Sequence, residues 1–165
     1  MRDLAQAPNR GLALLQPATR FTLALLLVFA LASYAVMVCL GLARSGLTPE
    51  SIMQYYAGAH PEEAKSSGEL LEITHFHLFA MPMLLFVLGH VFLMCRWPGA
   101  TLRRAIVLAA FAGAACDLAA PWLVIHVGPA CAWVKVGGRL LLAPALLVMT
   151  LIPLWEIARA PRATR

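Results

Sequence analysis

Four long apolar runs, separated by short polar segments, dominate the pattern of this chain. A run of about 20 helical residues, at 1.5 Å each, crosses roughly 30 Å of hydrocarbon. We therefore predict an all-α fold: an integral membrane four-helix up-down bundle with short turns between neighbouring helices. The bundle covers residues 21–157, and its predicted spans are residues 21–43, 70–95, 104–126 and 137–156.

Polar segments complete the predicted organisation: a cytoplasmic arm over residues 1–20, an outer loop over 44–65 and a cytoplasmic tail over 158–165. Within the loop, Thr48-Pro49 is typical of a helix start, and Gly58 is typical of a helix end. Ser66 and Glu69 have the spacing of a capping box, which predicts that the second long helix begins there.

Charge is scarce and unevenly placed. Only 13% of the 165 residues are charged and 61% are hydrophobic, with a formal net charge of +5. Nine arginines flank the apolar runs at what would be one side of the membrane: Arg2, Arg10, Arg20, Arg96, Arg103, Arg104, Arg159, Arg162 and Arg165. Five of the eight acids gather in or beside the loop on the other side: Glu50, Glu62, Glu63, Glu69 and Glu72. The positive-inside rule then places both termini in the cytoplasm. The basic excess is topological, so we expect contact with the lipid bilayer and no nucleic-acid partner.

The four cysteines, Cys39, Cys95, Cys116 and Cys131, form no recognisable motif. There is no C-x-x-C-H for covalent haem attachment and no paired C-x-x-C for zinc. Cys39 and Cys131 are both expected near the outer surface, where an oxidising compartment would allow them to pair. The sequence leaves both states of these two thiols open.

Polar residues inside the predicted spans are the candidates for function, because ionisable groups are costly in lipid. The second span carries His75, His77 and His90, and the third carries Asp117 and His126. At 100° per residue, His75 and His77 point about 160° apart. His75 and His90 share a face but lie roughly 22 Å apart along the axis, like ligands of two stacked sites.

These histidines indicate a haem site. The second and third spans are antiparallel, so His75 or His77 lies at the same depth as His126. Two imidazoles on facing helices are the ligands of a six-coordinate b-type haem. We predict a redox or electron-transfer subunit that holds one haem b near the outer face, with a respiratory or c-type cytochrome as its partner. His90 would lie by a second, inner site that lacks a histidine opposite.

Two alternatives remain open for the same residues. Glu72 and His75 have the Glu-x-x-His spacing of carboxylate-bridged metal sites, and with His126 they form a candidate metal site. The other alternative is a non-catalytic accessory or structural subunit of a larger membrane complex, without a cofactor. No phosphate-binding loop, G-x-S-x-G or H-E-x-x-H motif indicates a familiar enzyme.

Asp117 is predicted to be a buried polar residue that faces the bundle. A carboxylate at that depth needs a hydrogen-bond partner. We expect a hydroxyl group on a neighbouring helix, with Tyr34, Ser33 and Thr150 as candidates. Lys135 and Arg139, at the outer end of the fourth span, are expected to extend toward the interface.

Two segments carry a resemblance. Leu70 to Phe79 reads LLEITHFHLF and is followed by Met81-Pro82, and Cys116 to Leu123 reads CDLAAPWL. Both resemble an uncharacterised family of small four-span proteins of the bacterial inner membrane. The resemblance implies a multi-pass inner-membrane protein whose signature is the Thr74–His77 block with Asp117-x-x-x-Pro121-Trp122; it implies no particular activity. The architecture is also loosely similar to small b-type cytochromes, although the first and fourth spans carry no histidine.

Overall fold

The computed structural model describes residues 11–160 and shows a bundle of long helices. Arg2, Arg10, Arg162 and Arg165, with the rest of 1–10 and 161–165, lie outside the described residues. The long helices are α2 (Pro17–Ser45), α4 (Ser67–Leu93), α5 (Ala100–His126) and α6 (Ala132–Ala158). Shorter elements are η1 (Leu12–Leu14), α3 (Pro49–Ala57), η2 (Pro61–Glu63) and η3 (Pro129–Cys131). No strand occurs within residues 11–160, so the predicted all-α fold is confirmed.

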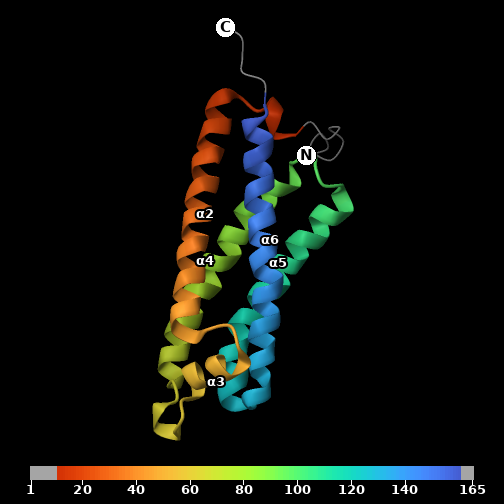
Figure 1. Cartoon of the computed structure of the whole chain (residues 1–165). Helices are drawn as coiled ribbons and strands as arrows, with labels where there is room; N and C mark the ends of the chain where they lie inside the picture. Colours follow the sequence, from red (N-terminus) through yellow and green to blue (C-terminus); the bar gives the residue numbers. More distant parts are fainter. Residues whose placement is uncertain (1–10, 161–165) are drawn as a thin grey trace.

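Four helical segments in this part of the chain are long and apolar enough to cross a membrane: Pro17–Ser45, Ser67–Leu93, Ala100–His126 and Pro129–Ala158. They pack together as one bundle, with α3 at one end and η1 at the other (Figure 1). Long side chains such as Phe29, Phe79 and Leu108 are exposed on the outside of the bundle. In a protein that crosses a bilayer, such an apolar surface faces the lipid chains.

The predicted helix starts and ends are confirmed. The Thr48 hydroxyl accepts from the backbone N–H of Ser51 at 3.2 Å, and α3 ends at Gly58, whose φ is +71°. The Ser66 hydroxyl accepts from the Glu69 N–H at 3.3 Å, while the Glu69 carboxylate accepts from the Ser66 N–H at 2.8 Å. This capping box satisfies the exposed amides at the start of α4.

The segment before the first span differs from the predicted arm over residues 1–20. Within 11–20, Leu12–Leu14 form η1, and α2 already begins at Pro17. Leu12 is fully buried in the main core. The reason is the apolar run Leu12–Leu15, whose Leu12 gains more by packing against the ends of the long helices than by staying in water.

α6 is the most enclosed of the four long helices, because α2, α3, α4, α5 and η1 all pack against it. α5 carries several small residues that allow a neighbouring helix to come close, and it packs most extensively against α6. α2 also lies mainly against α6, beside α3 (Figure 1).

Candidate functional site

An ion-pair cluster connects the C-terminal half of α5 to the N-terminal half of α6. The Lys135 ammonium lies 3.0 Å from Oδ1 of Asp117 and also donates to the Asp117 backbone carbonyl at 3.0 Å. The Arg139 Nε lies 3.7 Å from the same Oδ1. Lys135 is only 5% exposed, so its charge depends on this carboxylate for compensation. We name Asp117, Lys135 and Arg139 the ionic cluster.

Two glycines allow the helices to come close enough for these contacts. A Cβ atom on Gly113 would lie 2.7 Å from the Leu142 backbone nitrogen and 2.8 Å from the Gly138 carbonyl oxygen. A Cβ atom on Gly138 would lie 2.8 Å from the Asp117 backbone nitrogen. Small residues permit such close backbone approach between membrane helices. The Gly113–Gly138 crossing therefore sets the position of Asp117 against α6.

Arg139 also binds the end of α2. Its guanidinium donates to the Gly46 carbonyl and to the Ser45 hydroxyl, the latter at 2.6 Å. The Ser51 hydroxyl of α3 donates to the Ser45 carbonyl at 2.9 Å. One side chain of α6 thereby holds the C-terminal end of the first span and the start of the outer loop.

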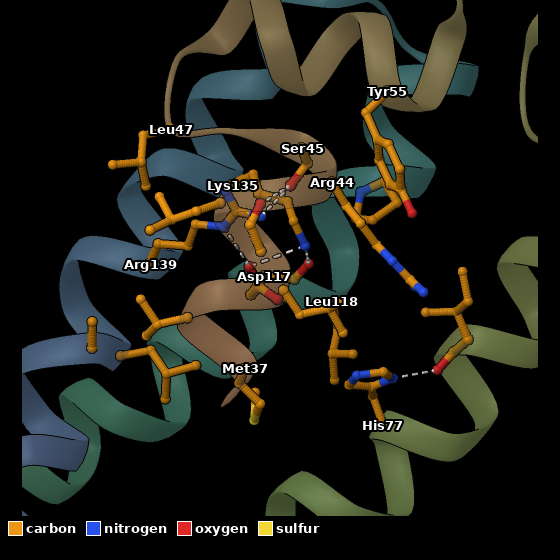
Figure 2. A pocket seen from close by; sticks show the side chains of 18 of the residues that line it. Met37, Arg44, Ser45, Leu47, Tyr55, His77, Asp117, Leu118, Lys135 and Arg139 are labelled. Atoms are coloured by element: carbon orange, nitrogen blue, oxygen red, sulfur yellow. Dashed lines mark hydrogen bonds and ion pairs between the residues drawn. The ribbon is translucent and has the colours of Figure 1, made fainter. Parts of the chain in front are cut away.

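A cavity of about 370 Å³ lies beside the ionic cluster, bordered by α2, α3, α4, α5 and α6 (Figure 2). Most of its lining is apolar, with Met37, Leu118, Leu142 and Leu146 among the side chains. The polar and charged lining residues are Tyr34, Arg44, Ser45, Tyr55, Tyr56, Thr74, His77, Asp117, Lys135 and Arg139. We name this space the α2–α4 cavity, after the two helices at its sides. One part of the cavity is therefore lined by apolar side chains and another part by charged side chains.

Tyr56, in the outer loop, borders both the cavity and the ionic cluster. Its ring lies 5.6 Å from the Lys135 ammonium, a cation–π contact. Burial raises the pKa of Tyr56 to about 12, and the nearby charges of Asp117 and Tyr55 add to the rise, while Arg139 opposes it. The phenol is therefore neutral at physiological pH and remains a hydrogen-bond donor.

Of the five histidines, all within the described residues, only His77 lines the cavity. Its Nδ1 lies 2.8 Å from the Ile73 carbonyl oxygen, as Figure 2 shows. A carbonyl only accepts, so Nδ1 carries a hydrogen in this contact; in the tautomer with its single hydrogen on Nδ1, Nε2 is a hydrogen-bond acceptor.

The other predicted ligands lie apart from this space. Glu72, His75, His90 and His126 are exposed; the His90 ring contacts Phe86, and His126 stacks on Trp122 with ring centroids 5.8 Å apart. Within residues 11–160, no three His, Cys, Asp or Glu side chains form a group able to hold a metal ion. The predicted set of Glu72, His75 and His126 is therefore not brought together. These three side chains stay apart because they lie on the outer surfaces of their helices. The face of α4 that packs inward carries Thr74 and His77 instead.

The four cysteines, also within the described residues, are free thiols. Cys39 is exposed on α2, while Cys131 is half-buried in η3. Cys95, beyond the end of α4, is fully buried, and its thiol donates to the Val91 carbonyl at 3.7 Å. Burial, followed by the nearby charge of Glu156, raises the pKa of Cys95 to about 12, so this thiol stays protonated at neutral pH.

Asp117 has different partners from those predicted. Lys135 and Arg139 replace the hydroxyls of Tyr34, Ser33 and Thr150, and the Thr150 hydroxyl instead donates to the Leu146 carbonyl at 2.7 Å. The two cations were expected to extend toward the interface. The spacing of Lys135 and Arg139 could have predicted these contacts, because residues four apart lie on one face of a helix. Both side chains face the Asp117 carboxylate on the neighbouring helix.

The two segments that carry the family resemblance meet at the cavity. Thr74 and His77 line it from α4, while Asp117 and Pro121 line it from α5. The Trp122 indole Nε1 donates to the Thr74 hydroxyl at 2.9 Å and joins the two segments. Residues far apart in sequence therefore build one wall.

These features define a class: a multi-pass helical membrane protein with an internal, partly charged cavity. The chain belongs to the family described as a transmembrane helical domain, whose model matches residues 46–164, more than half of the sequence. The matched region contains α3 to α6 and hence the whole ionic cluster. The chain matches no curated protein and no solved structure.

Proposed function

We propose that this protein is a membrane-embedded binding protein that holds one amphiphilic molecule in the α2–α4 cavity. The observation that carries the proposal is the joining of a largely apolar space to the ionic cluster. An apolar lining with a few convergent polar groups is the usual composition of a small-molecule site, and its volume falls within the range of about 300–1,000 Å³ for such sites.

The positions of the polar and apolar lining residues along the helices support an amphiphilic ligand. The ionic cluster, Arg44 and Tyr55 lie toward the ends of the helices, where polar head groups and water meet the membrane. Leu118, Leu142 and Leu146 extend the lining along the helices, toward the hydrocarbon depth. A ligand with a polar end and an apolar body would match both parts.

The test is to fill the cavity. Ala143 of α6 is half-buried and lines the space, so Ala143→Phe should displace the ligand. Ala119→Phe is the matched control, because Ala119 is exposed on α5 and does not line the cavity. Native mass spectrometry of protein purified in a mild detergent should show a retained molecule in the wild type and in Ala119→Phe. Equal retention by Ala143→Phe would contradict the proposal.

The haem hypothesis, with its redox role and cytochrome partner, rests on one feature of this site. His77 borders the cavity with Nε2 as a lone-pair donor, which is the form that ligates iron. His126 lies outside the lining, so another group would have to supply a second ligand to the iron. A reduced-minus-oxidised optical spectrum tests this: a haem protein should show an α band that His77→Ala removes. A colourless, iron-free protein would exclude it.

The accessory-subunit hypothesis makes the opposite prediction. A structural subunit of a larger complex should co-purify with other membrane proteins and retain no ligand. Ala143→Phe should then leave its behaviour unchanged, which separates this hypothesis from the binding proposal.

A further inference from the structure

The charges around the cavity indicate what kind of head group it would take. Three lining residues are cationic, Arg44, Lys135 and Arg139, and only one, Asp117, is an acid. Counting lysine, arginine and acidic side chains, the lining has a formal excess of two positive charges. Arg44 is exposed, but Lys135 and Arg139 lie next to the apolar space and share a single carboxylate, and such an excess of enclosed charge is costly unless an anion compensates it.

We propose that the amphiphile in the α2–α4 cavity carries an anionic phosphate or carboxylate head group, which Arg44 and Arg139 bind. The proposal rests on the binding function above and narrows its ligand to one chemical class. Arg44 is the first contact at the mouth, Arg139 lies farther in, and Asp117 is a positioning residue that holds Lys135 and Arg139 in place.

Asp117 alone does not balance its two neighbours. Its Oδ1 is within hydrogen-bonding distance of the Lys135 ammonium at 3.0 Å, but the Arg139 Nε is at 3.7 Å, beyond a normal hydrogen bond. The other groups that Arg139 binds, the Gly46 carbonyl and the Ser45 hydroxyl, are neutral. The guanidinium is therefore held in a fixed orientation with much of its charge available to a ligand.

Arg44 is suited to the first contact. It is the next-to-last residue of α2, is exposed, and lines the cavity. Figure 2 shows its side chain extending beside Tyr55 toward the space that His77 borders. A guanidinium offers paired N–H donors that match phosphate or carboxylate oxygens. Lys65 adds a further cation nearby, with its ammonium 4.6 Å from the centre of the Tyr55 ring.

The source of the anion is expected to be a lipid. A soluble phosphate would use the charged wall only, whereas the same cavity continues along apolar side chains such as Leu118 and Leu146. A phospholipid with a net negative charge uses both parts: its phosphate lies by the arginines and part of an acyl chain enters along the leucines, while the rest of the lipid stays in the surrounding bilayer.

The experiment is a competition between two lipids with identical chains. Purified full-length protein is titrated with an equimolar mixture of dioleoyl phosphatidylglycerol and dioleoyl phosphatidylcholine, and bound lipid is counted by native mass spectrometry. We expect about a tenfold preference for phosphatidylglycerol. Arg44→Gln should reduce it toward parity, and because Arg44 is exposed this variant should fold normally.

Arg159→Gln is the matched control. It removes the same charge from an exposed residue at the opposite end of the bundle, where Arg159 lies over the Trp155 ring. Its preference should remain that of the wild type. An equal loss in both variants would mean that phosphatidylglycerol binds through general surface charge, which would overturn the inference.

The remaining outcomes separate the two proposals. Equal binding of both lipids, blocked by Ala143→Phe, would keep the binding function and overturn the anionic head group. Retention of neither lipid would overturn both. A third arm uses inorganic phosphate alone: stabilisation against heating equal to that given by phosphatidylglycerol would overturn the lipid as the source of the anion.

Discussion

Glu156 is a buried carboxylate that connects three parts of the chain at the end of the bundle that carries η1. Its Oε1 accepts from the Leu12 backbone N–H at 2.7 Å, and its Oε2 accepts from the Arg96 N–H at 2.9 Å. Each oxygen therefore satisfies an amide from a different connecting segment. This explains why an acid occurs amid the arginine-rich end of the molecule.

Replacing Glu156 should therefore destabilise the protein. Glu156→Ala leaves the buried Leu12 amide without an acceptor, at about 1–3 kcal/mol, and also removes the acceptor of the partly buried Arg96 amide. Thermal unfolding in detergent would measure the loss. Glu62→Ala, in the outer loop at an exposed position, is the control and should change stability by less than about 0.5 kcal/mol. Equal unfolding temperatures for the two variants would show that Glu156 does not hold the segments.

Asp117 should behave as one half of a buried ion pair. Asp117→Leu leaves the Lys135 charge buried without its carboxylate, at about 3–5 kcal/mol. Asp117→Asn should cost less, because its amide oxygen still accepts a hydrogen bond. Unfolding curves of both variants in detergent would compare them.

A double variant sharpens this prediction. Adding Lys135→Met to Asp117→Leu removes both charges and should recover much of the stability lost in the single variant. If the double variant were as unstable as the sum of the two single ones, the pair would not be coupled.

At the scale of elements, the crossing of α5 and α6 determines the shape of the site. Gly113 and Gly138 bring the two backbones together, and this close approach places Asp117 within reach of Lys135. α2 is held less extensively, through α6 and the hydrogen bonds of Arg139. The cavity lies where the side of α2 faces α4.

Gly113→Ala tests this crossing. The added methyl group would meet backbone atoms of α6 at 2.7 and 2.8 Å, which cannot rotate away as a side chain would. The helices must separate, so we expect a loss of about 1–3 kcal/mol, the usual range for overpacking. Gly137→Ala is the control, because a Cβ there meets nothing within 4 Å and alanine favours a helix. Thermal unfolding should rank Gly137→Ala at or above the wild type, and the reverse order would contradict the crossing.

At the scale of the whole molecule, the arginines predict how the bundle is oriented in the membrane. Arg20, Arg96, Arg103 and Arg159 lie at the end of the bundle that carries η1, whereas the acidic loop lies beside α3. The positive-inside rule predicts cytoplasmic termini and an outer loop.

Reporter fusions test this orientation. A reporter that is active only outside the cytoplasm should give no signal when fused after Arg165, and a clear signal when inserted after Glu63. Activity of the C-terminal fusion would mean that the bundle is inverted or has an odd number of spans.

The sequence alone determined the helices, and the reason is local. Apolar runs of membrane-spanning length, the capping box at Ser66 and Glu69, and the Thr48 cap each depend on residues close together in the chain. The sequence also singled out Asp117 as a polar residue inside a span, because burying a carboxylate always requires a partner.

Only the tertiary structure decided which partner Asp117 has and which histidine lines a cavity. Helical periodicity fixes the angle between His75 and His77, but the packing of α4 determines which of them turns inward. Lys135 pairs with Asp117 because Gly113 and Gly138 let α5 and α6 come close. Such contacts depend on how two helices cross, and no short stretch of sequence specifies that crossing.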